Sequence, residues 1–316
     1  MVIQYGHETV CPHHDRLQLA AYGSVNLTLC TFCGLVFSSR INEKSAGTGS
    51  YDDFYTKTGA KRFRFGAESL VRLFRMGRAV FLTLLAPGAE TILDIGSGRG
   101  WMLHDLRRKY HFKRTAGIQI SRPAVEFSRK VLGLEIYDRD LLETDLGRSR
   151  FDIVTIWHVL EHVKRPQETI RRCRELLNPG GMLVVEVPNF DSWTCPWTLP
   201  KWLGFDPSHH LTFFTQSSLI SLLERNGFDI RRIRTFSLEY STFISAQSIL
   251  DRITGEDQYF FRWLQVPSLS AKALLHLMLF CLLAPPCLLV NLALFWTGKG
   301  EVVRLVARRR SGPQVS

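Results

Sequence analysis

A glycine-rich turn between an apolar strand and a helix constrains the fold of this chain more than any other segment. Residues 91–101 read TILDIGSGRGW, in which a short apolar stretch leads into three glycines spaced G-x-G-x-G. Glycine lacks a Cβ atom, so the backbone can turn sharply there and approach a ligand closely. The helix-compatible run MLHDLRRKY follows at once and offers free N–H groups. This order predicts a nucleotide-type cofactor site on an α/β sheet.

The spacing of the glycines distinguishes between cofactor classes. Dinucleotide-binding folds carry G-x-G-x-x-G after their first strand, whereas here the third glycine comes one residue earlier and an aspartate precedes the first by two places. This D-x-G-x-G-x-G arrangement resembles motif I of the class I S-adenosylmethionine (SAM) dependent methyltransferases. The resemblance implies that the loop packs against the methionine part of SAM through Asp94, Gly96, Ser97, Gly98 and Gly100.

Strands and helices alternate along the rest of the chain, which favours a doubly wound sheet. Apolar stretches at 115–121, 134–137 and 182–189 predict strands, and so does the nearly continuous apolar first half of 151–166. We therefore expect an α/β fold, the Rossmann-like, seven-stranded sheet of class I methyltransferases. The expected organisation is an N-terminal module (1–45), a linker with a helix (46–88), the SAM-binding domain (89–245), a helical insert (246–297), and a last strand with a basic tail (298–316).

The resemblance extends to residues that follow the later strands. An acidic residue normally ends the second strand and holds the cofactor's ribose hydroxyls, but this chain has Gln119 there. An amide loses the charge-assisted hydrogen bond, which is about twice as strong as a neutral one. Asp140 and Leu141 stand where the family contacts adenine, and Trp157 and His158 follow the fourth strand at the cofactor pocket.

Three longer stretches narrow the family further. FDIVTIWHVLEHVKRP, VPNF and HLTFFTQSSLISLLERNGF resemble the bacterial methyltransferase-23 group, which is related to the ubiquinone-biosynthesis O-methyltransferases. The resemblance covers roughly residues 88–240, and GKGEVVRLVARR resembles the group's last, antiparallel strand. It implies an enzyme that transfers a methyl group from SAM to an oxygen of a lipid-linked, glycan or quinone-like acceptor.

Two histidines are candidates for the catalytic base. An oxygen nucleophile must lose its proton, best to a group that titrates near neutral pH. His158 follows the fourth strand at the carboxyl edge of the sheet, where open α/β sheets bind ligands, and His210 lies in the loop where substrate usually enters. Each could instead cap a helix or bond a loop carbonyl. His158, Glu161 and His162 would share one helix face, and we expect a hydrogen-bond network there rather than a metal.

A second cluster of candidate ligands lies near the N-terminus. Cys11, His14, Cys30 and Cys33 form C-x2-H and C-x2-C pairs separated by fifteen residues. Paired ligands brought together by a hairpin are what a tetrahedral structural zinc requires. The pattern resembles the zinc ribbons of related methyltransferases, with His13 as an alternative ligand. Four unrelated surface residues are the competing interpretation.

Cysteine usage and charge indicate the compartment and the partners. Seven cysteines without framework spacing favour a reducing environment, and the first residues lack the apolar core of a signal peptide, so we expect a cytoplasmic protein. The net charge of +11 favours anionic partners: nucleic acid, phosphorylated substrates or anionic lipid.

One apolar segment favours lipid among these partners. Residues 273–296 carry no formally charged side chain and are long enough to span a bilayer. A single crossing would separate the last strand from its sheet, and the pair Pro285-Pro286 interrupts the run. We expect a helical hairpin (273–297) that enters one leaflet and returns, with Lys272 and Lys299 at the headgroups, so that the protein is peripheral or monotopic on the cytoplasmic face. A soluble helical pair that covers the sheet or a dimer interface is the alternative.

Two other functions compete with a membrane-associated methyltransferase. An RNA-modifying methyltransferase would use the N-terminal module and the basic surface, but the basic residues are dispersed without aromatic stacking residues among them, so we expect nucleic acid not to be the partner. A non-catalytic SAM-binding relative would explain Gln119. The acceptor and the oligomeric state are not indicated by the sequence.

Overall fold

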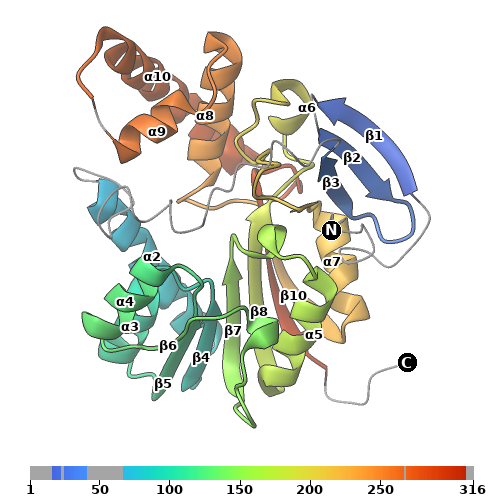
Figure 1. Cartoon of the computed structure of the whole chain (residues 1–316), viewed down its shortest axis with the longest axis vertical. Helices are drawn as coiled ribbons and strands as arrows, with labels where there is room; N and C mark the ends of the chain where they lie inside the picture. Colours follow the sequence, from blue (N-terminus) through green and yellow to red (C-terminus); the bar gives the residue numbers. More distant parts are fainter. Residues whose placement is uncertain (1–15, 23–24, 41–66, 267, 311–316) are drawn as a thin grey trace, which may run out of the picture.

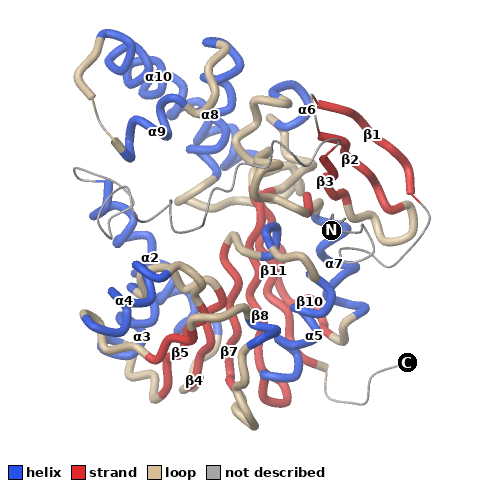
Figure 2. The backbone as a smooth tube through the Cα atoms, in the orientation of Figure 1, coloured by secondary structure: helices blue, strands red, loops and turns tan. Residues whose placement is uncertain are grey.

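A seven-stranded sheet forms the centre of the protein (Figures 1 and 2). The computed structural model describes residues 16–22, 25–40, 67–266 and 268–310. The strand order is β10-β11-β8-β7-β4-β5-β6, in which β11 runs antiparallel to both of its neighbours and the remaining pairs are parallel. The strands are β4 (Thr91–Ile95), β5 (Arg114–Ile118), β6 (Glu135–Tyr137), β7 (Phe151–Trp157), β8 (Leu177–Pro188), β10 (Phe228–Arg234) and β11 (Val302–Arg309).

Helices cover both faces of this sheet, as the predicted doubly wound fold requires. The central strands are apolar on both sides, since Ile153 and Val154 of β7 are both fully buried and face opposite helix layers. One layer contains α2 (Ala67–Leu85), α3 (Trp101–Lys109) and α4 (Arg122–Lys130), and the other contains α5 (Pro166–Leu176) and α7 (Gln216–Arg225). The fold class and the last antiparallel strand are therefore confirmed.

The N-terminal residues form a second, antiparallel sheet beside the first. Its order is β1-β2-β3-β9, with β1 (Arg16–Tyr22), β2 (Val25–Cys30), β3 (Val36–Arg40) and β9 (Thr212–Phe213). The short strand β9 belongs to the loop after β8, so this sheet is paired directly with that loop. Cys30 and Cys33 lie at the turn between β2 and β3, whereas the predicted ligands Cys11 and His14 lie outside the described residues.

Three helices follow β10: α8 (Ser241–Thr254), α9 (Tyr259–Gln265) and α10 (Ala271–Ala293). Figure 1 places them at the end of the molecule toward which β7 and β8 point. The short α6 (Cys195–Thr198) lies in the loop after β8, and two 3₁₀ turns, η3 (Leu141–Glu143) and η4 (Leu160–His162), follow β6 and β7. Judged by length and composition, α10 is the one helix of the described residues that could cross a membrane.

The predicted hairpin at 273–297 is wrong, because α10 continues as one helix through Pro285 and Pro286. The prolines remove two backbone N–H groups, yet both halves of the helix keep contacts on the same side. Ala273 is buried in the first half, as are Cys287 and Asn291 in the second. Asn291 Nδ2 donates a hydrogen bond to Ser245 Oγ of α8 at 2.8 Å. Packing of both halves against the protein therefore keeps the helix continuous where local propensity predicts a break.

Candidate functional site

The glycine turn after β4 has a backbone that only glycine accommodates without strain. Gly96, Gly98 and Gly100 have φ angles of 74°, 55° and 72°, in the left-handed region. A Cβ atom on Gly96 would lie 2.2 Å from a methyl group of Val159, and one on Gly100 would lie 2.4 Å from a methyl group of Leu134. The turn therefore brings backbone close to the segment after β7 and to the residue before β6, the close approach that the sequence predicts for a cofactor cradle.

Polar groups at this turn suit a ligand that is both polar and cationic. Asp94 is buried and accepts a hydrogen bond from Thr155 Oγ1 at 2.6 Å. Burial raises the pKa of Asp94 to about 6, against that hydrogen bond. The Ser97 hydroxyl is buried and has no partner among the described residues, although buried polar groups are normally hydrogen-bonded. The sulfonium and amino groups of SAM match this carboxylate and this unsatisfied hydroxyl.

Gln119 follows β5 directly, and the oxygen of its side-chain amide already accepts a hydrogen bond within the protein. Its Oε1 accepts the Ser121 backbone N–H at 3.0 Å, at the start of α4. This contact ends β5 at Ile118, earlier than the predicted strand of residues 115–121. Because the oxygen faces the helix, the amide N–H groups remain as the donors for a ribose hydroxyl.

The predicted adenine contacts lie one strand further along the sheet. Asp140 caps η3, accepting the Leu142 N–H at 2.9 Å. Leu141 is 2% exposed and belongs to the core. The cofactor residues predicted from sequence are thus placed after β4, β5, β6 and β7, which all end at one edge of the sheet.

His158 lies in a buried ionic cluster just after β7. It has a φ of 53°, a strained value for a residue other than glycine. Its Nε2 atom is 3.1 Å from Glu186 Oε1, and its Nδ1 atom is 3.6 Å from Glu161 Oε1. Burial lowers the pKa of His158, but the two carboxylates raise it by more than burial lowers it, so that the pKa is about 10. The side chain is therefore an imidazolium at neutral pH, which suits an electrostatic or positioning role and not that of a general base.

The cluster extends to residues that the sequence analysis did not identify. Glu186 of β8 is fully buried and accepts a hydrogen bond from Arg304 Nε of β11 at 2.7 Å. Arg78 of α2 lies 3.7 Å from the same carboxylate. Both guanidinium groups pack on the Trp157 ring, Arg78 at 4.3 Å and Arg304 at 5.1 Å from its centre. A sequence signal existed, since Glu186 is the single charged residue of β8 and Arg304 stands between the apolar pairs 302–303 and 305–306 of β11.

His210 lies beside His162 and Glu161, in the loop between β8 and β9. Its Nδ1 atom is 2.9 Å from the Gly204 carbonyl oxygen, which can only accept. The neutral ring therefore carries its proton on Nδ1, and Nε2 is left as an acceptor. Burial lowers the pKa of His162 to about 4, and repulsion from the neighbouring His210 imidazole adds to the effect of burial. Of the two predicted catalytic histidines, His210 is the one whose geometry leaves a basic nitrogen.

Potential metal ligands meet at the same place. Glu161, His162 and His210 offer ligand atoms that all lie within 4.8 Å of one another. This set differs from the predicted helical face of His158, Glu161 and His162. Residues 160–162 form a 3₁₀ turn and not an α-helix, so that His158 and His162 point to different partners. His158 faces the carboxylates, whereas His162 Nδ1 donates to the His209 carbonyl at 3.0 Å. The two histidines therefore bond to different partners, and the expected choice of a hydrogen-bond network over a metal stays a prediction.

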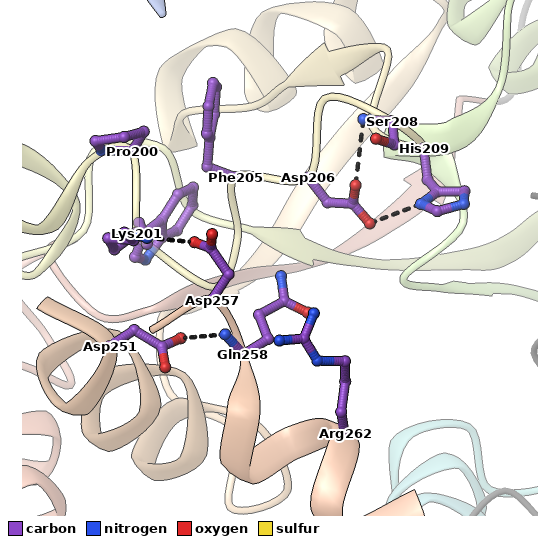
Figure 3. A pocket seen from close by; sticks show the side chains of 11 residues that line it. Pro200, Lys201, Phe205, Asp206, Ser208, His209, Asp251, Asp257, Gln258 and Arg262 are labelled. Carbon is purple, nitrogen blue, oxygen red and sulfur yellow. Dashed lines mark hydrogen bonds and ion pairs between the residues drawn. The ribbon is translucent and has the colours of Figure 1, made fainter. Parts of the chain in front are cut away.

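A polar cavity of about 290 Å³ opens between the loop that precedes His210 and helices α8 and α9 (Figure 3). Asp206 pairs with His209 at 2.7 Å, and Asp251 accepts the Gln258 N–H at 3.0 Å. Arg262, Asp257 and Lys201 complete its charged lining, and the last two pair at 2.6 Å. Carboxylates and an amide around a small cavity suit a ligand that carries several hydroxyl groups.

Comparison with known proteins identifies the fold family. The profile of a family described as a methyltransferase domain matches residues 60–233. The mitochondrial ubiquinone biosynthesis O-methyltransferase of Saccharomyces cerevisiae is 35% identical over 113 residues, 33% of this chain and 36% of that protein. The ubiquinone biosynthesis O-methyltransferase of Cereibacter sphaeroides is 28% identical over 148 residues, 44% of this chain and 60% of that protein. These matches span about a third to three fifths of the relatives.

Solved structures are more distant. A SAM-dependent methyltransferase from Archaeoglobus fulgidus aligns with a TM-score of 0.48 at 21% identity, covering 75% of this chain and 94% of that one. The N-methyltransferase NodS from Bradyrhizobium japonicum, solved with S-adenosyl-L-homocysteine, aligns with a TM-score of 0.43 at 14% identity, covering 75% and 86%.

Proposed function

Because this chain belongs to the methyltransferase-domain family, we propose that it is a SAM-dependent enzyme that methylates an oxygen of a membrane-borne acceptor. The glycine turn at residues 96–100 is the observation that carries the cofactor assignment, since its backbone admits no side chain at two of its positions. The names of the curated relatives support a quinone-like acceptor, whereas the polar cavity supports a hydroxyl-rich one. Lipid-linked, glycan and quinone-like acceptors therefore stay within the proposal.

In this proposal the chain contributes positioning and proton removal. SAM supplies a methyl group that is already activated toward in-line displacement, so that holding the reactants in place provides much of the rate. Asp94 and Ser97 would hold the amino-acid end of SAM, and the Gln119 amide would donate to a ribose hydroxyl. Trp157, held by contacts with Arg78 and Arg304, would form a wall of the pocket.

We assign the general base to His210. Its Nδ1 proton is held by the Gly204 carbonyl, so Nε2 can take the proton of an acceptor hydroxyl. His158 serves as a fixed cation: the carboxylates of Glu161 and Glu186 keep it protonated. The two predicted catalytic histidines would thus have different tasks.

Association with a membrane is supported by the exposure of α10. Leu274, Met278, Leu282 and Leu289 are 59%, 62%, 71% and 68% exposed. At 3.6 residues per turn these positions share one face, opposite the buried Asn291. Since β11 lies between β10 and β8, both ends of α10 belong to one side of a bilayer. A helix that lies in the membrane interface with its apolar face toward the hydrocarbon would bury this face and keep both of its ends on one side.

A structural zinc site in the N-terminal module remains part of the proposal. Cys30 ends β2, and the Gly34 N–H donates to the Cys30 carbonyl at 2.8 Å, which forms a tight turn. Gly34 has a φ of 72°, which favours glycine after the second cysteine of the pair. This local geometry brings the pair Cys30 and Cys33 to one turn, as a zinc ligand pair requires. Cys11 and His14 would complete the set.

The test of the proposed reaction is transfer of radiolabelled methyl groups from SAM to a membrane lipid extract, followed by fractionation of the product. We expect label in a lipid-soluble fraction with wild type and none with a variant that cannot bind SAM. Label confined to RNA, or to no fraction at all, would contradict the proposed acceptor class.

RNA modification is the second candidate, because the net charge is +11. Flotation with anionic vesicles separates the two. The substitutions L282D and L289D place charges on residues exposed in the protein, so they leave folding intact while they oppose bilayer insertion. L84D on α2 is the matched control, since Leu84 is 74% exposed and lies outside α10. Flotation that persists in L282D/L289D would overturn the role of α10.

A further inference from the structure

A groove with an arginine-rich lining opens beside the C-terminal end of α10. It lies between the end of β10 and the turn that leads from α10 toward β11, and its volume is about 550 Å³. Arg231, Arg232 and Arg234 of β10 line it together with Phe295 and Trp296. None of the described residues that line it is acidic. The groove is therefore a site of positive charge with two aromatic rings.

The arginines are only weakly compensated by acidic groups. The closest carboxylate to Arg231 is that of Asp229 at 4.0 Å, and Asp229 also receives Arg310 at 2.6 Å. Arg234 stacks on aromatic rings instead, with its guanidinium 4.4 Å from the Trp296 ring. Arg232 is exposed at the groove. Guanidinium groups with free N–H donors bind phosphate through paired hydrogen bonds.

The groove continues the exposed apolar face of α10. Trp296 is 74% exposed, lies three residues beyond the end of α10 at Ala293, and also forms a wall of the groove. Tryptophan is enriched where hydrocarbon meets headgroups. A helix whose leucines face hydrocarbon would thus bring Trp296 and the neighbouring arginines to the depth of the lipid phosphates.

The lysines at the two ends of α10 are less suitable for this role than the arginines. Lys272 pairs with Glu256 at 2.6 Å, and Lys299 pairs with Asp191 at 2.6 Å. Both charges are already neutralised within the protein. Neither lysine therefore adds an uncompensated charge to that of the β10 groove.

We propose that the groove binds the phosphate headgroup of an anionic phospholipid in the leaflet that receives α10. This proposal rests on the membrane association proposed above and adds a site to it. The apolar face would supply affinity for any bilayer, whereas Arg232 and Arg234 would supply the preference for anionic lipid. That preference would also fix the rotation of the protein on the membrane, since the groove occupies one end of the helix.

The test is binding of the full chain to vesicles of phosphatidylglycerol with phosphatidylcholine, and to vesicles of phosphatidylcholine alone. We expect R232Q/R234Q to bind the anionic vesicles about 30-fold more weakly than wild type, because each basic group near such a surface contributes enough for about fivefold. Binding to neutral vesicles should be unchanged. The control R148Q/R171Q removes two exposed arginines from other surfaces and should bind like wild type. SAM affinity, measured alongside, reports that each variant is folded.

Four results would overturn the proposal. If R232Q/R234Q binds anionic vesicles like wild type while L282D/L289D does not, the groove fails but the membrane association stands. Equal binding of wild type to anionic and neutral vesicles would remove the headgroup site. Binding of soluble glycerol phosphate as tight as that of vesicles would assign the groove to a free phosphate compound. A wild type that binds no vesicle, yet binds SAM, would overturn the membrane association itself.

Discussion

The His158 imidazole and the Glu186 carboxylate lie 3.1 Å apart, measured from Nε2 to Oε1, at the carboxyl ends of the paired strands β7 and β8. The His158 backbone N–H also donates to the Glu186 carbonyl at 2.8 Å. Glu186 in addition holds Arg304 of β11 and approaches Arg78 of α2. One carboxylate therefore joins two strands, a helix and the loop that borders the proposed cofactor pocket.

Removing this charge should destabilise the protein strongly. The substitution Glu186→Gln would leave three buried cations with one carboxylate fewer, and breaking a buried pair typically costs about 3–5 kcal/mol. Glu126→Gln is the matched control, because Glu126 is 64% exposed in its pair with Lys130 and should contribute less than about 1 kcal/mol. Urea unfolding of both variants measures the difference. Equal stability of the two would show that the cluster is not a structural centre.

The raised pKa of His158 predicts that the free energy of unfolding decreases as the pH rises from 6.5 to about 10. The folded pKa is about 10, against 6.5 for the free side chain. Between these values the folded state holds a proton that the unfolded state has lost, so the stabilisation is complete below pH 6.5 and declines as pH rises toward 10. The slope is at most about 1.4 kcal/mol per pH unit.

The substitution His158→Gln should flatten this part of the pH profile. The measurement is the free energy of unfolding at several pH values from neutral to alkaline, for wild type and variant. Profiles that run parallel would mean that another group is responsible for the alkaline loss, and that His158 is neutral in the folded protein.

The glycine turn offers a test that separates steric fit from backbone strain. Gly100→Ala puts a Cβ atom 2.4 Å from Leu134 at a φ of 72°, whereas Gly147→Ala accepts a φ of 53° with no atom within 4 Å. Both variants should lose about 1 kcal/mol of stability from backbone strain. We expect calorimetry to find SAM binding abolished in the first and unchanged in the second. Unchanged affinity in both would remove the turn from the cofactor site.

His210 is predicted to act on the acceptor without contributing to SAM affinity. His210→Gln should lower turnover by about 10²–10⁴-fold, the usual contribution of a general base. His111→Gln is the control, since His111 is exposed and precedes β5, at the edge of the sheet away from the site. The assay is labelled methyl transfer to the active lipid fraction. A His210→Gln enzyme as fast as wild type would end this assignment.

Metal analysis tests the N-terminal module. We expect zinc to copurify with the chain and to be lost when Cys30 and Cys33 are both replaced by serine, with a fall in thermal stability because structural zinc contributes folding free energy. Cys281→Ser is the control, because Cys281 is exposed on α10. Full zinc content in the double variant would place the metal elsewhere.

Local patterns in the sequence were sufficient to predict the parallel core. The glycine turn, the apolar stretch of β7 and the final strand β11 each depend on neighbours in sequence, and the structure confirms them. The α10 segment shows the limit of such patterns: two prolines predict a break, but contacts of Asn291 and Cys287 with the protein maintain one helix.

Contacts between distant residues account for what the sequence analysis missed in the site. Glu186 and Arg304 are separated by more than a hundred residues and meet only because β8 and β11 pair in register. The protonation of His158 depends on its contacts with the Glu161 and Glu186 carboxylates, so its position in the sequence made it a catalytic candidate without revealing its charge. The tautomer of His210 likewise depends on the fold of the loop around Gly204.

Calorimetric titration of the folded chain with SAM tests the central claim most directly. The account predicts saturable binding by wild type, its loss in Gly100→Ala, and its retention in Gly147→Ala and His210→Gln. Absence of any binding heat from a wild-type sample that unfolds cooperatively, confirmed by a second binding method, would contradict the assignment of the chain as a SAM-dependent methyltransferase.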